Sequence, residues 1–413
     1  MNVELREPVT IPRQDLETHP HKIFRFHRPR APVVLRDDGV YIAMRAADVE
    51  RLAMDPRTRQ METEYVESRG VVEGALFDLF DNTMLLSNGV DHRKRRAPVA
   101  RAFAYKLIMG IRPRIREIAN DLIDRQYARG DMNLRDDYAA RLPARVICEI
   151  LGIPRSDVPR FTRDVYQVAK AFSSSFARED VPAIQAAARD LTSYTMDLLR
   201  ARRTKPVNDF LSSYVAALEE SEKLSALETV IQIVTLILAG SDTTRAAMVI
   251  QTSLLLQHRE QWSSVCRDFA LVPGAVAESL RYEPAVGSFM RVTLEDIDLD
   301  GWVIPRNRMV SLSTLSAMRD PARYSDPDTF DIRRADHPRK HFVFGLGAHR
   351  CLGEVLATVE LEEGLAALTA RLPDMRLAAE PAVVHGSGGI RSVEDAWVCW
   401  PRRGAVSVPR NDG

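Results

Sequence analysis

The stretch from Leu224 to about His258 constrains the fold of this chain more than any other part of it. It contains no proline, and its first half is apolar almost all the way round, which is typical of a helix buried on every side. At about 1.5 Å per residue, such a helix would be on the order of 50 Å long. A helix of that length crosses a whole domain, so the rest of the chain has to be built around it.

A polar turn interrupts the middle of this stretch. The run from Ala239 to Thr244 consists mostly of poor helix formers, which would fit a kink or a helix end. The helical pattern resumes at once with Ala246 and continues to Leu254, which argues against an end. Because a weakened polar turn inside a buried helix usually serves function, the sequence predicts a functional groove at this turn.

The remaining segments are mostly helical in pattern. Helical periodicity covers residues 115–127, 158–172, 181–200 and 353–371. Short strands are expected at residues 39–44 and 292–299, and residues 302–313 are expected to return as the partner of the latter after an Asp300-Gly301 turn. A second turn is expected at 304–307, where Pro305 presets φ and Asn307 tolerates the left-handed region. The predicted fold class is mainly α with small β-sheets. No linker-like run divides the chain, so residues 1–413 are expected to form one domain.

Composition excludes several classes of function. Lys plus Arg equals Asp plus Glu at 57 each, so no global field favours nucleic acid or an anionic membrane. The cysteines Cys148, Cys266, Cys351 and Cys399 are far apart and do not form the close pairs of a zinc site or a redox dithiol. The start of the chain lacks a signal-peptide core, and no run of about 18 apolar residues occurs. We therefore expect a soluble cytoplasmic protein without a membrane anchor.

The most informative motif is the stretch from Phe344 to Gly353, Phe-Gly-Leu-Gly-Ala-His-Arg-Cys-Leu-Gly. Gly345 and Gly347 allow backbone conformations and a close approach to a flat ligand that side chains would block. Cys351 stands at the start of the helix led by Gly353, where free N–H groups and the helix dipole stabilise a thiolate.

This motif resembles the haem-binding signature of the cytochrome P450 family, Phe-Gly-x-Gly-x-His-x-Cys-x-Gly, with all six specified positions filled. A chance match has odds on the order of one in a hundred thousand. The resemblance implies a P450 fold in which haem b lies between the long central helix and the cysteine loop, with Cys351 as the metal ligand. Its contacts would include Phe344, Gly345 and Gly353. The other three cysteines are expected to be inert thiols.

Glu278-x-x-Arg281 is a second match to the family. Its i, i+3 spacing puts both side chains on one face of a helix, where such a pair alone is usually a weak surface ion pair. The resemblance implies instead a buried structural pair completed by an arginine further along the chain, here Arg334.

The basic cluster from Asp91 to Arg96 is a third match. Alone it would be a solvated face. The resemblance implies that His92 and Arg96 bind a haem propionate, together with Arg291 and His349, since guanidinium groups bind carboxylates in a bidentate fork. Arg93 and Arg95 are then expected to face solvent.

The polar turn of the long helix matches the family's oxygen-activating groove. By resemblance, Ala239 and Gly240 lie over the haem, and Gly240 leaves room for dioxygen. Thr243 is expected to hydrogen-bond the oxygen, and Asp242 to relay protons. Arg245, two positions after Thr243, is expected to point away from the haem.

The substrate pocket can be assigned only by position, and for each apolar member plain core packing is about as good an explanation. The expected lining comes from four segments: Leu76, Phe77, Leu79 and Phe80; Thr235, Leu238 and Ala239; Gly287, Ser288 and Phe289; and Ile390. This composition favours a medium-sized, mainly apolar ligand.

The resemblance implies a monooxygenase that hydroxylates an organic substrate with O2. Three alternatives stay open. A peroxygenase of the same fold typically lacks the acid–alcohol pair that Asp242 and Thr243 supply here. An intact groove argues against a non-catalytic haem sensor or carrier, and a nitric oxide reductase is excluded only weakly.

An electron donor is expected to be a separate protein, because the matching motifs already span the 413 residues. A 2Fe-2S ferredoxin and its ferredoxin reductase are implied, with this chain as a monomer. The cations Arg333, Arg334, Arg339, Lys340 and Arg350 outnumber the single acid Asp336 in the stretch 333–350. Even if half of them pair internally, the rest with Arg93 or Arg95 would form a basic patch for an acidic partner.

Overall fold

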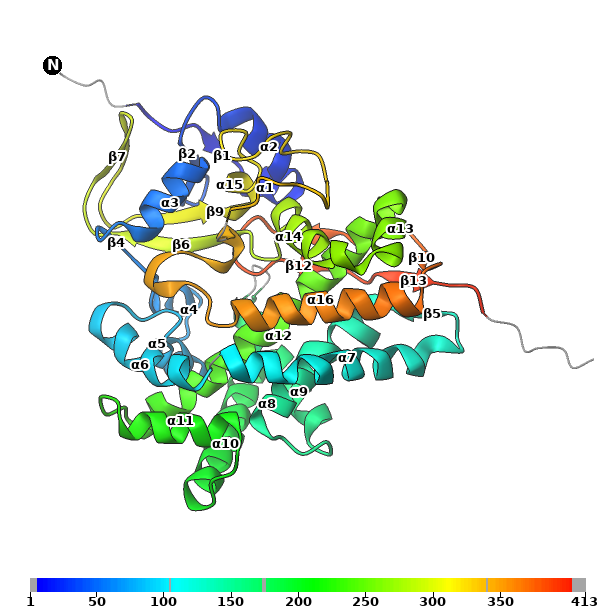
Figure 1. The fold of residues 1–413 in the computed structure, drawn as a ribbon. Helices are drawn as coiled ribbons and strands as arrows, with labels where there is room; N and C mark the ends of the chain where they lie inside the picture. Colours follow the sequence, from blue (N-terminus) through cyan, green and yellow to red (C-terminus); the bar gives the residue numbers. More distant parts are fainter. Residues whose placement is uncertain (1–5, 104, 173–175, 339–340, 403–413) are drawn as a thin grey trace, which may run out of the picture.

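A single long helix, α12 (Ala226–Gln257), lies in the middle of the helical part of the molecule (Figure 1). The computed structural model describes residues 6–103, 105–172, 176–338 and 341–402. Ser225 caps α12: its hydroxyl accepts from the Glu228 N–H, and the Glu228 carboxylate accepts from the Ser225 N–H. The helix continues through the polar turn at 239–244, so the predicted long helix is confirmed and the turn is neither an end nor a break.

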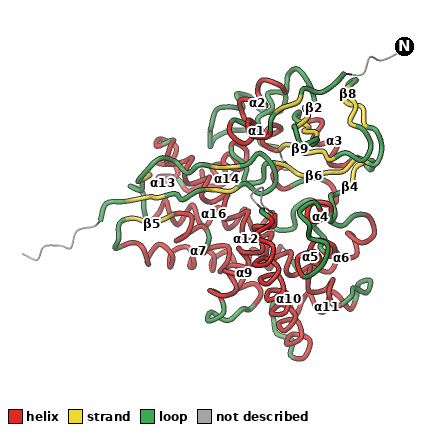
Figure 2. Tube along the Cα trace, turned by 180° about the vertical axis from the view of Figure 1, so that it is seen from behind, coloured by secondary structure: helices red, strands yellow, loops and turns green. Residues whose placement is uncertain are grey.

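The apolar surface of α12 is covered by other helices. By length and composition α12 is the one helix of the described part that could cross a membrane, but 78% of its apolar window is buried inside the molecule. Its main neighbours are α8 (Arg141–Leu151), α9 (Val158–Ala169), α10 (Val181–Thr204), α14 (Val272–Tyr282) and α16 (Glu354–Arg371). Figure 2 shows α12 surrounded by these helices from the opposite side. Burial on all sides explains why its sequence lacks a polar face.

The other predicted helices are present with shifted ends. The helix expected at 115–127 is the second half of α7 (Tyr105–Tyr127), which starts earlier and continues through Pro113. The one expected at 158–172 is α9 followed by the 3-10 turn η2 (Lys170–Phe172). The remaining helices and helical turns are α1 (Arg13–Thr18), α2 (Pro20–His27), α3 (Ala46–Met54), α4 (Glu64–Glu67), α5 (Ala75–Asn82), α6 (Gly89–Ala102), the π-helical η1 (Leu134–Ala139), η3 (Arg178–Asp180), α11 (Phe210–Glu219), α13 (Arg259–Arg267), η4 (Phe269–Leu271) and α15 (Thr314–Ala317).

The largest sheet has six strands in the order β1-β2-β3-β9-β6-β4. These are β1 (Thr10–Ile11), β2 (Val33–Arg36), β3 (Tyr41–Ala43), β9 (Met309–Ser313), β6 (Ser288–Thr293) and β4 (Thr58–Arg59). Three small sheets pair β10 (Arg376–Leu377) with β13 (Trp397–Cys399) and β5 (Asp131–Asn133), β11 (Val384–His385) with β12 (Ser392–Val393), and β7 (Ile297–Leu299) with β8 (Trp302–Ile304).

The expected single strand at 292–299 is wrong. The chain leaves β6 after Thr293, the N–H of Leu294 donates to the carbonyl of Arg57, and a separate strand β7 starts at Ile297. The return segment 302–313 is likewise split into β8, which pairs with β7, and β9, which pairs with β6. The expected turn at Asn307 separates β8 from β9, with φ of 59° at that residue.

A fully buried charge cluster joins α14 to the segment before the Phe344 motif. Glu278 and Arg281 are both 0% exposed, and two guanidinium nitrogens of Arg281 donate to the Glu278 carboxylate at 2.7 and 2.8 Å. Arg334 Nε lies 3.2 Å from Oε2 of the same carboxylate. Arg281 also donates to the carbonyls of Met318 and Pro327 at 3.0 and 2.8 Å. The structure thus brings the three expected structural residues together.

We predict that Glu278→Gln lowers the free energy of unfolding by about 3–5 kcal/mol, because it leaves Arg281 and Arg334 buried without their shared anion. Glu117→Gln is the matched control: its side chain is 64% exposed and pairs with Arg114, so its effect should be about 1 kcal/mol or less. Urea unfolding midpoints of the two variants check this. Equal midpoints would mean that the cluster does not hold the fold.

Candidate active site

A cavity of about 380 Å³ lies between α12 and the loop that contains the Phe344 motif. The loop is formed by two 3-10 turns, η5 (Phe342–Phe344) and η6 (Gly347–His349), and leads into α16. Gly345 and Gly347 have φ of 71° and 66°, which side chains rarely allow, so both glycines are needed for this loop. The loop's contributions to the cavity wall are Phe344, Gly345, Leu346, His349, Cys351, Leu352 and Gly353.

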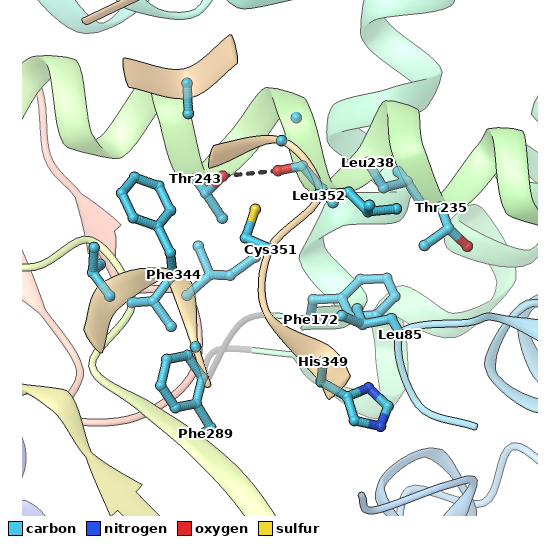
Figure 3. A pocket seen from close by; sticks show the side chains of 18 of the residues that line it. Leu85, Phe172, Thr235, Leu238, Thr243, Phe289, Phe344, His349, Cys351 and Leu352 are labelled. Atoms are coloured by element: carbon cyan, nitrogen blue, oxygen red, sulfur yellow. Dashed lines mark hydrogen bonds between the residues drawn. The ribbon is translucent and has the colours of Figure 1, made fainter. Parts of the chain in front are cut away.

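Cys351 is the cysteine that lines this cavity. In Figure 3 its sulfur points toward α12, on the side where Thr243 lies. Its N–H donates to the carbonyl of Phe344 at 2.8 Å, which closes the loop around the thiol. The other sides of the sulfur face protein, and this desolvation raises the pKa of the thiol, while a backbone hydrogen bond at Gly353 and the charge of Arg96 oppose the rise. A cation next to the sulfur would be needed to keep it ionised, and a metal ion supplies one.

The other three cysteines lie elsewhere. Cys148 is buried, and Cys266 and Cys399 are partly buried. Burial raises the pKa of Cys148 to about 12 and that of Cys266 to about 11, so both are poor nucleophiles and poor ligands at neutral pH.

Basic side chains gather at one end of the cavity. Arg96, Arg291 and His349 line it, and the ring of His92 lies against that of His349 with 3.9 Å between centroids. His92 Nε2 is buried without a hydrogen-bond partner. Burial lowers the pKa of His92 to about 4 and that of His349 to about 3.

The two arginines of this group also lack acids. Burial lowers the pKa of Arg291 to about 10, and its guanidinium donates to Gln60 Oε1 and to the carbonyl of Met290. Arg96 donates to the carbonyl of Arg350. No carboxylate of the described residues forms an ion pair with either arginine. This end of the cavity therefore fits an anionic ligand, and carboxylates such as the two propionates of haem meet that requirement.

The polar turn of α12 forms the opposite wall. Ala239, Gly240 and Thr243 line the cavity, and the Thr243 hydroxyl donates to the carbonyl of Ala239 at 2.8 Å (Figure 3). A Cβ at Gly240 would meet nothing within 4 Å, so this glycine leaves open space beside the cavity.

Asp242 lies outside the cavity wall. It is buried, and its carboxylate forms an ion pair with Arg245 one turn later. Arg245 points away from the cavity as expected, and its guanidinium lies 4.6 Å from the ring centroid of Tyr166. Burial raises the pKa of Asp242, and the positive charge of Arg245 opposes that rise.

Six of the expected substrate residues line the cavity: Thr235, Leu238, Ala239, Ser288, Phe289 and Ile390. Leu76, Phe77, Leu79 and Phe80 do not, because α5 packs its apolar side into the core and only its neighbour Phe172, stacked on Phe80 at 4.7 Å, reaches the cavity. The segment that does reach it follows α5 and comprises Met84, Leu85 and Leu86.

Gly287 is also displaced from the wall. Its N–H donates to the carbonyl of Gly389, and a Cβ on it would meet the carbonyl oxygen of Ser387 at 2.8 Å. The C-terminal segment therefore covers this glycine, and Ile390 from that segment takes its place on the cavity.

Glu360 is a cavity residue that sequence reasoning missed. It lies on α16, is 2% exposed, and lines the cavity near Gly240 and Thr243. Its Oε2 has no hydrogen-bond partner, and burial raises the pKa of its carboxyl well above the ordinary range. A carboxylate flanked by Val359 and Leu361 in an apolar helix was the available signal.

The expected basic patch is smaller in the structure. Arg95 is buried and bound to Glu228 at 3.1 Å and to the carbonyl of Asp81, so the prediction that it faces solvent is wrong. Arg334 is held by Glu278, and Arg350 by Glu354 and the carbonyl of Gly345. Arg93 and Arg333 are exposed. Arg339 and Lys340 lie outside the described residues.

Comparisons with known proteins agree with this site. The family model "Cytochrome P450" matches residues 71–371. The plant-inducible cytochrome P450-pinF1 of Rhizobium radiobacter is 42% identical over 392 residues, which are 95% of this chain and 93% of that protein. The mycinamicin IV hydroxylase/epoxidase of Micromonospora griseorubida is 36% identical over 73% of this chain and 75% of its own.

Solved structures are similar over nearly the whole length. The crystal structure of CalO2 has a TM-score of 0.87 at 28% identity, covering 94% of this chain and 98% of its own. The myxobacterial cytochrome P450 CYP267B1, in complex with myristic acid, has a TM-score of 0.84 at 33% identity with the same coverage. This chain therefore belongs to the cytochrome P450 family, the monooxygenases that use haem b with a cysteine thiolate as the axial ligand.

Proposed function

We propose that Cys351 is the axial thiolate of this enzyme and that the enzyme hydroxylates a medium-sized, mainly apolar substrate with O2. The observation that carries the proposal is the pairing of features within one cavity: a cysteine sulfur faces α12, and desolvated basic groups without acid partners stand at one end. Bound haem supplies dioxygen binding and O–O cleavage, which a thiolate ligand promotes.

Each residue of the cavity then has a defined task. Cys351 binds the iron, with Phe344, Gly345 and Gly353 shaping the loop around the sulfur. The residues that bind the propionates are His92, Arg96, Arg291 and His349. Ala239 and Gly240 leave room for dioxygen, and Thr243 holds a proton-donating hydroxyl beside it.

The chemistry of the cavity wall supports an apolar substrate. The side chains contributed by the α12 side and by the loops opposite include Leu85, Phe172, Leu238, Phe289 and Ile390, all apolar. The hydroxyl of Thr235 is already bonded to Thr83 Oγ1 and to the carbonyl of Ile231, both at 2.7 Å, so it does not add an unpaired polar group. Such a wall binds a hydrocarbon surface by excluding water.

We also propose that electrons from NAD(P)H reach this enzyme through a ferredoxin reductase and a 2Fe-2S ferredoxin, and that it works as a monomer in the cytoplasm. The loop 333–350 reaches the surface on the side of Cys351, with the exposed cation Arg333, and Arg93 is exposed on α6. Opposite charge on a small acidic protein would steer its encounter with these cations.

Cys351→His is predicted to abolish the red-shifted Soret band of the reduced carbon monoxide complex, because that band reports a thiolate ligand. Cys148→Ala, Cys266→Ala and Cys399→Ala should each keep it. The spectra of the four purified variants check this, and a requirement for one of the other cysteines would refute the ligand assignment.

Thr243→Ala is predicted to keep haem and substrate binding while diverting electrons to hydrogen peroxide, because the variant loses the hydroxyl that steers protons to the distal side. Thr244→Ala, in the next position of α12, is the control and should stay closer to the parent enzyme. Peroxide and product are measured per NAD(P)H consumed. Full coupling in Thr243→Ala would contradict the role, although a retained water could soften the loss.

Reduction by the cognate ferredoxin is predicted to slow about tenfold or more as salt rises through about 0.15 M, where the screening length is about 8 Å. Arg333→Glu, Arg339→Glu and Lys340→Glu should slow it at low salt. Arg189→Glu, a charge reversal at an exposed site of α10, should not. Stopped-flow reduction measures the rate, and indifference to both salt and charge reversal would place docking elsewhere.

A further inference from the structure

Two carboxyl groups flank the polar turn of α12, and their surroundings differ. Asp242 follows the turn on α12 itself and forms an ion pair with Arg245 outside the cavity wall. Glu360 comes from α16 and lines the cavity together with Gly240 and Thr243. Only the second of these carboxyl groups therefore opens onto the space where dioxygen would react.

Glu360 has no cation to keep it ionised. Its Oε2 is buried without a hydrogen-bond partner, and no ion pair involves it among the described residues. The arginines of the elements packed around α16 are already bound: Arg112 and Arg116 of α7 to Glu363, Arg145 of α8 to Asp121, Arg245 of α12 to Asp242, Arg259 of α13 to the carbonyl of Met375, and Arg281 of α14 to Glu278.

The remaining titratable neighbours are neutral. Tyr166 of α9 donates to the carbonyl of Ala140 at 2.6 Å, and Tyr138 of η1 donates to that of Gly364 at 2.8 Å. Burial raises the pKa of both phenols, so neither supplies charge near neutral pH. A carboxyl group buried in this setting is stable only with its proton on, because an unpaired buried carboxylate would cost several kcal/mol.

Two acids held in opposite protonation states by their surroundings commonly take different roles in one site. We propose that Glu360, rather than Asp242, is the acid that supplies a proton on the cavity side of Thr243. This inference rests on the proposed monooxygenase function. Reduction of O2 to one inserted oxygen atom and one water consumes two electrons, delivered by the ferredoxin, and two protons. Glu360 gives one of these protons, and its carboxylate takes one back from solvent water.

Arg245 explains why Asp242 does not take this role. Its guanidinium lies over the ring of Tyr166 and is bound to the Asp242 carboxylate, so it favours the ionised form of Asp242 and holds that group away from the cavity. An ionised carboxylate has no proton to give, and one turned outward cannot reach the distal side.

Infrared difference spectroscopy of the ferric holoenzyme tests the protonation state without turnover. We expect a carboxylic acid C=O band that is present in the parent protein from pH 6 to pH 8, shifts in heavy water and disappears in Glu360→Gln. It should persist in Asp242→Asn and in Glu363→Gln, the matched control one turn along α16 whose carboxylate is ionised and bound to Arg112 and Arg116. Absence of the band from the parent protein, or its loss in Asp242→Asn instead, would overturn the proposal.

Turnover provides the second test. Glu360→Gln should lower the rate of product formation about 10²-fold or more and raise the peroxide formed per NAD(P)H, while Glu363→Gln keeps both near the parent values. The carbon monoxide spectrum of Glu360→Gln should remain that of a thiolate complex, which separates this test from the ligand assignment to Cys351. Full coupling in Glu360→Gln would overturn the inference and leave the monooxygenase proposal intact.

Discussion

A buried charge has to be paired, and this constraint organises the molecule on both sides of its cavity. Away from the cavity, Glu278 and Arg281 are fully buried yet satisfied by each other, by Arg334 and by backbone carbonyls. Inside the cavity, the thiol of Cys351 and the basic groups around Arg291 are desolvated without such partners. The first arrangement is complete within the protein, whereas the second is complementary to a ligand that carries a metal cation at its centre and carboxylates at its edge.

The long helix and the cysteine loop provide the geometry for this complementarity. α12 is rigid because it is packed on all sides, and its polar turn is placed on the cavity by the same packing. The loop is fixed by positive φ angles at Gly345 and Gly347 and by the bond from the Cys351 N–H to the Phe344 carbonyl. Since neither element depends on the substrate-facing loops, those loops can vary in sequence without moving the cysteine.

The sequence predicted best what depends on local pattern. The ends of α12 follow from a capping box and from apolar periodicity, and the Phe344 motif has a fixed spacing, so both are readable without a structure. The strand expected at 292–299 failed because Leu294 bonds to Arg57, a residue far away in sequence. Pro113 hid the first half of α7, although tertiary packing lets the helix continue through it.

The cavity wall was harder to predict because burial and cavity exposure look alike in a sequence. Leu76 and Phe80 are apolar and precede the basic helix as expected, but α5 buries them in the core and leaves the cavity to the segment around Leu85. Arg95 looked like its exposed neighbour Arg93, and only its pairing with Glu228 of α12 distinguishes the two. Glu360 was invisible because its importance lies in what is missing around it, which no sequence pattern records.

The central claim is that the sulfur of Cys351 is bonded to the haem iron, and resonance Raman spectroscopy tests that bond directly. The most telling sample is the ferric holoprotein carrying Cys148→Ala, Cys266→Ala and Cys399→Ala, grown with cysteine that contains a heavy sulfur isotope. With Cys351 as the remaining cysteine, the account predicts an iron–sulfur stretching band that moves to lower frequency with the heavy isotope. A folded, haem-loaded sample whose spectrum has no isotope-sensitive band would contradict it.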